Sequence, residues 1–302
     1  MKATHAKGIL FIGVLFASLS AIFARYSDAP ALIISLYRMA WSVLLLLPAV
    51  LRPACRAELK SLSRREVGMS LLSGIFFALH LFLWFESLNH TSIAGASVLL
   101  STEVVFAALG FSFLLRGHLP TMAVTAIVIS MAGSGLVAVG GEGSPHLYGN
   151  LLALGAAVAS AVYTLIGRSV RARISTTSYT FLLYCSCLAC LLLMVLATGT
   201  PLLGYSPKEL LIALALCITC NFLGHSIFSW CLRYLTPSFV SAAKLAGPLV
   251  ATVLGLLLFR EIPHLTEIIG GAIILGGLYL YCRVEQAEAE LDGLAAPAGR
   301  TE

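Results

Sequence analysis

Charged residues are scarce in this chain. Aspartate, glutamate, lysine and arginine make up 11% of its 302 residues, and hydrophobic residues make up 59%. In an ordinary soluble domain, about a quarter of the residues are charged. No gap between the apolar segments is long enough to hold a soluble domain. We therefore expect an all-α integral membrane protein whose function lies in or beside the bilayer.

The signatures of several enzyme classes are also missing. The sequence contains no G-x-x-x-x-G-K-[ST], no G-x-S-x-G and no H-E-x-x-H motif. ATP-driven transport by this chain therefore has no support, and the hydrolase and metalloprotease classes are disfavoured. Because no nucleophile and base show a recognisable spacing, we expect neither an enzyme nor a cofactor.

Metal and nucleic-acid sites are not expected either. The pairs Cys187-x-x-Cys190 and Cys217-x-x-Cys220 imitate metal-ligand spacing, but they lie within apolar helices. Small side chains are what contacts between membrane helices favour, so we interpret these cysteines as packing residues. The net charge of +5 is spread over short loops without a basic stripe, which disfavours nucleic-acid binding.

Ten apolar segments are each about as long as the 17 to 25 residues that span a bilayer. They cover residues 8–25, 30–51, 67–88, 92–115, 121–140, 147–167, 177–199, 209–231, 237–259 and 264–282. Lys2 and Lys7 make the first segment similar to a signal peptide. Its apolar part is longer than a typical signal peptide requires, so we expect an uncleaved helix.

The basic residues predict the orientation in the membrane. With a cytoplasmic N-terminus, fourteen of the nineteen lysines and arginines fall in inside segments and three in outside loops. This asymmetry follows the positive-inside rule, with the run from Arg52 to Arg65 as its strongest signal. Binding of anionic lipids is an alternative role for that run. We expect a multi-pass protein of the plasma membrane, of the bacterial inner-membrane type, with both termini cytoplasmic.

The chain also contains an internal duplication. Residues recur in the same order 142 to 146 positions later: Gly13 with Gly155, Ala17 with Ala159, Ser18 with Ser160, His80 with His225, Trp84 with Trp230, Pro120 with Pro263 and Gly133 with Gly276. Five helices per half is an odd number, so the halves enter the membrane in opposite directions. We expect residues 1–140 and 141–283 to be two inverted five-helix repeats, followed by a cytoplasmic tail at 284–302.

Two opposite charges lie at membrane depth. Glu103 is about midway along its helix, and Lys244 is about 10 Å from the cytoplasmic end of its own. A charge there costs about 2.5 to 3.5 kcal/mol on insertion scales, so it needs a partner, a protein interior or a wet cavity. A carboxylate at that depth suits a proton carrier or a cation site. The sequence leaves open whether the two charges pair with each other or face a cavity.

Other polar and aromatic side chains at membrane depth complete the candidate substrate-binding set: Arg38, His80, Trp84, Asn221, His225 and Trp230. Arginine suits a carboxylate or phosphate group, or it locks helices together. The histidines and the asparagine form hydrogen bonds between helices or contact a ligand. The tryptophans are interfacial anchors or cavity walls. Glu86, near the end of its helix, is interpreted as a wet rim residue.

The sequence resembles the EamA-like branch of the drug/metabolite transporter superfamily, whose members have ten helices. The likeness rests on Ser35-Leu36-Tyr37-Arg38, Ala78-Leu79-His80, Trp84-Phe85, Ser87-Leu88, Thr91-Ser92, Gly224-His225, Trp230, Val240-Ser241, Pro248 and Glu261 with Pro263. The chain departs from the family where Val104 replaces a frequent proline and where Gly247 replaces a frequent glutamate. At Gly117-His118 the family usually has Gly-Glu, and here Arg260 precedes Glu261.

The resemblance implies alternating access between two five-helix bundles, commonly to export amino acids, other small metabolites or drugs. Our leading hypothesis is a secondary transporter of a small polar metabolite, with a cavity between the third, fourth, eighth and ninth helices. Glu103 would bind an amine or a coupling proton, and Lys244 or Arg38 an anionic group, so an amino acid would satisfy both. A non-transporting scaffold, a lipid-handling subunit and a channel are the alternatives.

Overall fold

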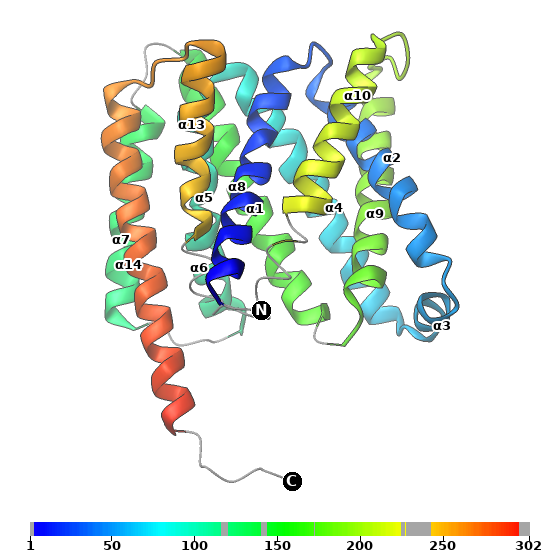
Figure 1. The fold of residues 1–302 in the computed structure, drawn as a ribbon, viewed down its shortest axis with the longest axis horizontal. Helices are drawn as coiled ribbons and strands as arrows, with labels where there is room; N and C mark the ends of the chain where they lie inside the picture. The colour runs from blue at the N-terminus through cyan, green and yellow to red at the C-terminus, as the bar shows by residue number, and fades with distance from the viewer. Residues whose placement is uncertain are drawn as a thin grey trace.

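The computed structural model describes residues 3–115, 120–139, 144–171, 173–224, 227 and 243–295. Its elements are α1 (Ala3–Tyr26), α2 (Ala31–Val50), α3 (Pro53–Ser61), α4 (Arg64–His90), α5 (Ile93–Ser101), α6 (Glu103–Leu115), α7 (Thr121–Val139), α8 (Ser144–Arg171), α9 (Thr176–Thr198), α10 (Pro207–Leu216), the π-helix η1 (Cys217–Gly224), α13 (Ala246–Phe259) and α14 (Leu265–Ala295). Within these ranges no strand occurs, and the long helices form one upright bundle (Figure 1).

Nine helical stretches in the described ranges are long and apolar enough to cross a membrane, and α13 is a shorter apolar helix. The expectation of an all-α membrane protein is therefore confirmed. The eighth and ninth predicted spans each extend into residues that lie outside the described ranges. In Figure 1, α1 runs upward from the N-terminus whereas α8 runs downward, which is the inverted arrangement that the odd number of helices predicts.

Three features of the helices differ from the sequence prediction. The predicted span 92–115 is interrupted at Thr102, which separates α5 from α6. The loop after α2 contains the short helix α3, which begins at Pro53, because proline is well suited to a first helical position. The last helix continues beyond the predicted end at residue 282, as far as Ala295.

Small residues bring α7 and α14 into close contact. A Cβ atom added to Gly133 would lie 2.8 Å from the backbone oxygen of Gly270, and one added to Gly270 would lie 2.9 Å from that of Gly133. Only glycine fits at either position without a shift of the backbone. Membrane helices associate mainly through such close packing, because lipid tails are as apolar as the helix surfaces and the hydrophobic effect contributes little.

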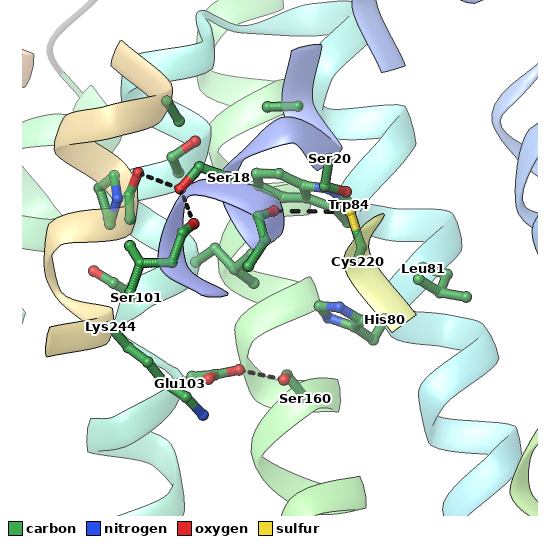
Figure 2. Close-up of a pocket in the computed structure, with 18 of the residues that line it drawn as sticks. Ser18, Ser20, His80, Leu81, Trp84, Ser101, Glu103, Ser160, Cys220 and Lys244 are labelled. Carbon is green, nitrogen blue, oxygen red and sulfur yellow. Dashed lines mark hydrogen bonds between the residues drawn. The ribbon is translucent and has the colours of Figure 1, made fainter. Parts of the chain in front are cut away.

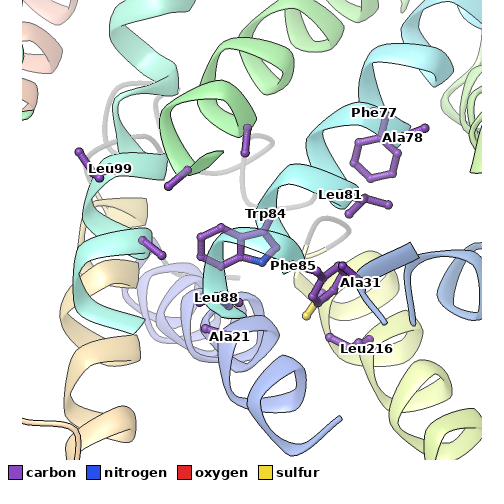
Figure 3. Close-up of a cluster of buried hydrophobic side chains, with 14 of the residues drawn as sticks. Ala21, Ala31, Phe77, Ala78, Leu81, Trp84, Phe85, Leu88, Leu99 and Leu216 are labelled. Atoms are coloured by element: carbon purple, nitrogen blue, oxygen red, sulfur yellow. The ribbon is translucent and has the colours of Figure 1, made fainter. Parts of the chain in front are cut away.

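Helix α4 supplies the centre of the bundle. Phe77, Leu81, Trp84 and Leu88 recur at helical spacing on its buried face, and they pack among residues of neighbouring helices (Figure 3). Ile75, in contrast, is on an exposed face of α4, as expected for a side chain that meets lipid. This pattern turns one face of α4 toward the interior, where His80 and Trp84 reach the site described next.

Candidate functional site

The two charges at membrane depth lie next to one-residue breaks in the helical pattern. Thr102, with φ −67° and ψ −4°, separates α5 from α6, and Leu245, with φ −64° and ψ −16°, directly precedes α13. Both residues keep right-handed helical dihedrals, so the breaks are local and the backbone is not unwound there. Glu103 follows one break, and Lys244 precedes the other.

A cavity of about 230 Å³ lies beside these breaks. Its walls come from α1, α2, α4, α5, α6, α8, η1 and α13, together with Lys244. Its polar side chains are those of Ser18, Ser20, Arg38, His80, Trp84, Ser97, Ser101, Glu103, Ser160, Tyr163 and Lys244. Among its described lining residues, the cavity therefore combines one carboxylate with two cationic groups inside a membrane-spanning bundle.

Glu103 is held in place by the second half of the chain. The hydroxyl of Ser160, a buried residue of α8, donates a hydrogen bond to Oε2 of Glu103. Lys244 extends alongside the same carboxylate, close enough for the two charges to interact (Figure 2). Both charged groups also line the cavity. A solute there would meet a negative and a positive group side by side.

An aromatic wall adjoins the carboxylate. Nδ1 of His80 lies 3.0 Å from the backbone oxygen of Ala156. A carbonyl oxygen only accepts hydrogen bonds, so Nδ1 carries a proton, and Nε2 of the neutral ring is an acceptor. The imidazole stacks on Phe77 at 5.9 Å and lies 6.1 Å from the ring of Tyr163. These contacts fix the orientation of His80 within the cavity wall.

Arg38 has a structural partner in addition to its place at the cavity. Its Nε and Nη2 atoms donate to Oδ1 of Asn221, at 3.2 and 2.5 Å. Asn221 in turn donates to the hydroxyl of Ser42 at 2.7 Å. The guanidinium carbon is 6.0 Å from the centre of the Phe85 ring. The π-helix η1 thus presents Asn221 to α2 and locks the arginine in place, as expected for local widening at a functional site.

The opposite end of the cavity is lined by hydroxyl groups that are engaged with the protein. Ser18 donates to the backbone oxygen of Val14 at 2.8 Å and lies 3.1 Å from that of Gly247. The indole of Trp84 donates to the hydroxyl of Ser20 at 3.3 Å (Figure 2). The charged side chains among the described lining residues are those of Glu103, Lys244 and Arg38. The serines at this end are polar but uncharged.

A network of polar contacts ties the cavity helices together beyond this end. Nη2 of Arg25 is 2.8 Å from Oε1 of Glu261 and donates to the backbone oxygen of Thr91 at 2.8 Å. The other carboxylate oxygen of Glu261 accepts from the backbone nitrogen of Ile93 at 2.9 Å. Arg25 follows Ser18 by seven residues, which is about 10 Å along the helix. The network therefore joins α1, the start of α5 and the segment after α13.

A second carboxylate strengthens the same end. Glu267, which is buried at the start of α14, accepts from the hydroxyl of Ser92 at 2.5 Å and from the backbone nitrogen of His264 at 3.0 Å. Thr91 donates to Oδ1 of Asn150 on α8 at 2.7 Å. The predicted turn between the third and fourth helices is thus anchored on both sides, and both halves of the chain contribute.

The structure brings together five of the eight residues predicted to bind substrate: Arg38, His80, Trp84, Glu103 and Lys244. Asn221 is absent from the described lining of the cavity and contacts Arg38 instead. His225 and Trp230 lie outside the described residues. The cavity adjoins the predicted third, fourth, eighth and ninth helices, and it also involves the first, second and sixth.

Sequence reasoning missed the serines and the tyrosine of the cavity. The signal for two of them was present, because Ser18 and Ser160 match in the internal duplication and both line the cavity. Ser97 has a counterpart 144 positions later, Ser241, but this match was not used in the prediction. Tyr163 had no such signal, since tyrosine is common in membrane helices as a packing or hydrogen-bonding residue.

Known proteins resemble this chain along most of its length. The EamA-like transporter family model matches twice, at residues 7–139 and 147–283. An uncharacterized transporter of Clostridium kluyveri is 24% identical over 253 residues, which cover 81% of each chain. The uncharacterized transporter YxxF of Bacillus subtilis is 25% identical over 234 residues, covering 76% of this chain and 74% of the relative.

A solved crystal structure shares the fold. It has a TM-score of 0.62 and 20% sequence identity, and the match covers 95% of this chain and 99% of that one. The two family matches account for most of the chain and correspond to its internal repeat. This chain belongs to the EamA-like transporter family.

Proposed function

We propose that this transporter exports small polar metabolites such as amino acids by alternating access, with protons as the coupling ion. The observation that carries the proposal is the placement of Glu103 and Lys244 in one cavity inside the membrane bundle. A charge at membrane depth is costly, and intramembrane ionisable groups mark substrate or ion pathways by default. A zwitterion would offset both charges at once.

The size of the cavity supports a small solute. Its volume of about 230 Å³ is below the range of about 300 to 1,000 Å³ that is usual for drug-sized ligands. In our proposal, the ammonium group of an amino acid binds Glu103, and its carboxylate faces Lys244 or Arg38. The Ser160 hydroxyl keeps the Glu103 carboxylate oriented toward the solute.

The network of Arg25 and Glu261 supports alternating access. It holds α1, α5 and the segment after α13 together at the end that the positive-inside rule assigns to the outside. Release of a solute to that side requires these helices to separate, so the Arg25–Glu261 ion pair must break in each cycle. We propose that residues 1–140 and 141–283 are the units that move, and that residues 284–302 form a cytoplasmic tail.

The test compares solutes inside and outside bacterial cells that produce wild-type protein, Glu103→Gln, Glu86→Gln or no transporter. Glu86 is a matched control because it is a carboxylate of the neighbouring helix α4, lies outside the cavity and contacts Asn89 and His90. Membrane levels are matched by immunoblot, and the external pH is varied on both sides of neutral to change the proton gradient across the membrane.

We expect wild type and Glu86→Gln to shift the same class of amino acids outward, and Glu103→Gln to lose at least tenfold, as removal of a buried charge partner does. Export by wild type should vary with external pH. Normal, equally pH-dependent export by Glu103→Gln would contradict the role of the carboxylate. Wild-type cells that resemble cells without the transporter would contradict amino-acid export.

A further inference from the structure

Ser97 combines a place in the cavity wall with an unusual hydrogen-bonding state. The residue lies on α5, is 8% exposed and lines the cavity. Its hydroxyl oxygen is shielded from water and has no hydrogen-bond partner in the described part of the chain. Buried polar groups are nearly always hydrogen-bonded, and each exception calls for an explanation.

Other serines in these helices show what Ser97 lacks. The hydroxyls of Ser18 and Ser42 donate to the carbonyl oxygen four residues earlier, and that of Ser101 donates to the carbonyl three residues earlier. Such a bond is available to a helical serine by rotation about one side-chain torsion. The hydroxyl of Ser97 therefore lacks the backbone carbonyl partner that the other serines have.

We propose that Ser97 is a substrate-binding residue that hydrogen-bonds an uncharged polar group of the solute. The inference rests on the proposed function, because it adds a second contact to a solute whose charged end is held by Glu103 and Lys244. Rotation about the Ser97 side-chain torsion turns the hydroxyl toward the cavity that the residue lines. A hydroxyl or carbonyl group of the solute then supplies the missing partner.

The spacing of the two contacts limits the solute. Ser97 and Glu103 are six residues apart, or about 9 Å along the helix axis, and both residues line the cavity. A charged head group and a polar group only a few bonds away fit between them. The structure thus favours amino acids with an uncharged hydrogen-bonding side chain over aliphatic ones.

The experiment uses L-threonine and L-valine, which have the same shape and differ by a hydroxyl in place of a methyl group. Purified protein is reconstituted in liposomes, and exchange of each radiolabelled amino acid is measured for wild type, Ser97→Ala, Ser97→Cys and Ser35→Ala. Ser35 is the matched control, because its hydroxyl is also buried without a described partner but the residue does not line the cavity. Thermal unfolding in detergent is measured in parallel.

We expect wild type to prefer threonine, and Ser97→Ala to lower the threonine-to-valine ratio about two- to tenfold, the value of one net hydrogen bond. Valine exchange should stay the same or rise, and Ser97→Cys, whose thiol is a weak donor, should lower the ratio as well. Ser35→Ala should leave the ratio unchanged. Neither alanine variant should unfold at a lower temperature, since each removes an unsatisfied buried hydroxyl.

The outcomes separate this inference from the proposed function. An unchanged ratio in Ser97→Ala, or an equal loss of both amino acids, would overturn the role of Ser97 while the transport function stands. An equal change of the ratio in Ser35→Ala would also overturn it, because the effect would not depend on the cavity. Wild-type protein that exchanges neither amino acid would overturn the proposed function, and the inference with it.

Discussion

The two copies of the repeat make the same contact with different chemistry. Ser160 on α8 donates to the carboxylate of Glu103 in the first copy, and Ser18 on α1 lies against the backbone oxygen of Gly247 in the second. Ser18 and Ser160 correspond in the duplication, and Gly247 lies 144 positions after Glu103. A serine of each copy thus reaches the broken helix of the other. The residue that this serine contacts is a glutamate in one copy and a glycine in the other, so the two sides of the cavity differ.

The asymmetry divides the charges between the copies. The first copy supplies Glu103, directly after Thr102, and the second supplies Lys244, directly before Leu245. The other cation of the described lining, Arg38, also belongs to the first copy, and Asn221 of the second copy accepts its hydrogen bonds. If substrate binding needs Lys244 as well as Glu103, the two copies must be docked against each other for the site to exist, which couples binding to their relative movement.

The largest expected effect comes from moving the carboxylate to the other copy. In the double variant Glu103→Ala with Gly247→Glu, a carboxylate faces Ser18 instead of Ser160. A Cβ atom at Gly247 meets only the Ser18 hydroxyl, at 3.6 Å, so the new side chain has room to begin. Because Ser160 and His80 stay near position 103, we expect exchange in liposomes to remain at least tenfold below wild type, as in Glu103→Ala.

A normal rate for this double variant would show that the cavity needs only one carboxylate at either equivalent position. The single variant Gly247→Glu is the control, and its membrane insertion and elution in size-exclusion chromatography show whether the added charge is tolerated.

A smaller effect should distinguish the two serines. Ser160→Ala removes the hydrogen bond to Glu103, so exchange should fall about two- to tenfold. Ser18→Ala removes contacts with backbone oxygens only, so it should lower stability by about 1 kcal/mol and leave the exchange rate of the folded protein unchanged. Exchange rates in liposomes and thermal unfolding in detergent measure the two effects. Equal losses of exchange in the two variants would remove the functional distinction between the copies.

Sequence reasoning found the architecture and the charged centre but not the whole cavity. Hydrophobic length, basic loops and the repeat predicted the spans, because each is a direct consequence of the bilayer. Glu103 and Lys244 stood out because charge is rare at that depth. The break at Thr102 was missed, since no proline or glycine marks it. Ser97 was missed because its significance depends on an absent partner, which is a property of the packed structure.

At an end of the bundle, each copy also contributes a carboxylate that accepts hydrogen bonds from the other copy. Glu209 of α10 is 2% exposed and accepts from the hydroxyl of Ser27 at 2.5 Å. Glu58 of α3 is only half-buried and accepts from the backbone nitrogen of Ser175 at 2.6 Å and from the hydroxyls of Ser175 and Ser178. Both contacts stabilise the docking of the copies. Because Glu209 is more buried than Glu58, we expect its contact to contribute more to stability.

The smallest expected effect is therefore that of Glu58→Gln. Glu209→Gln should lower the free energy of unfolding by about 1 to 3 kcal/mol, because its buried partners lose a charged acceptor, whereas Glu58→Gln should cost less than about 1 kcal/mol at pH 7. Hydrogen bonds from Ser175 and then Ser178 lower the pKa of Glu58 below its ordinary value of 4.5. Its contribution is thus complete above pH 4.5 and is lost as the pH falls through the lower folded-state pKa. Thermal unfolding in detergent should show Glu58→Gln approaching wild type in acid, and a gap that persisted there would assign the stabilisation to packing of α3 rather than to the charge.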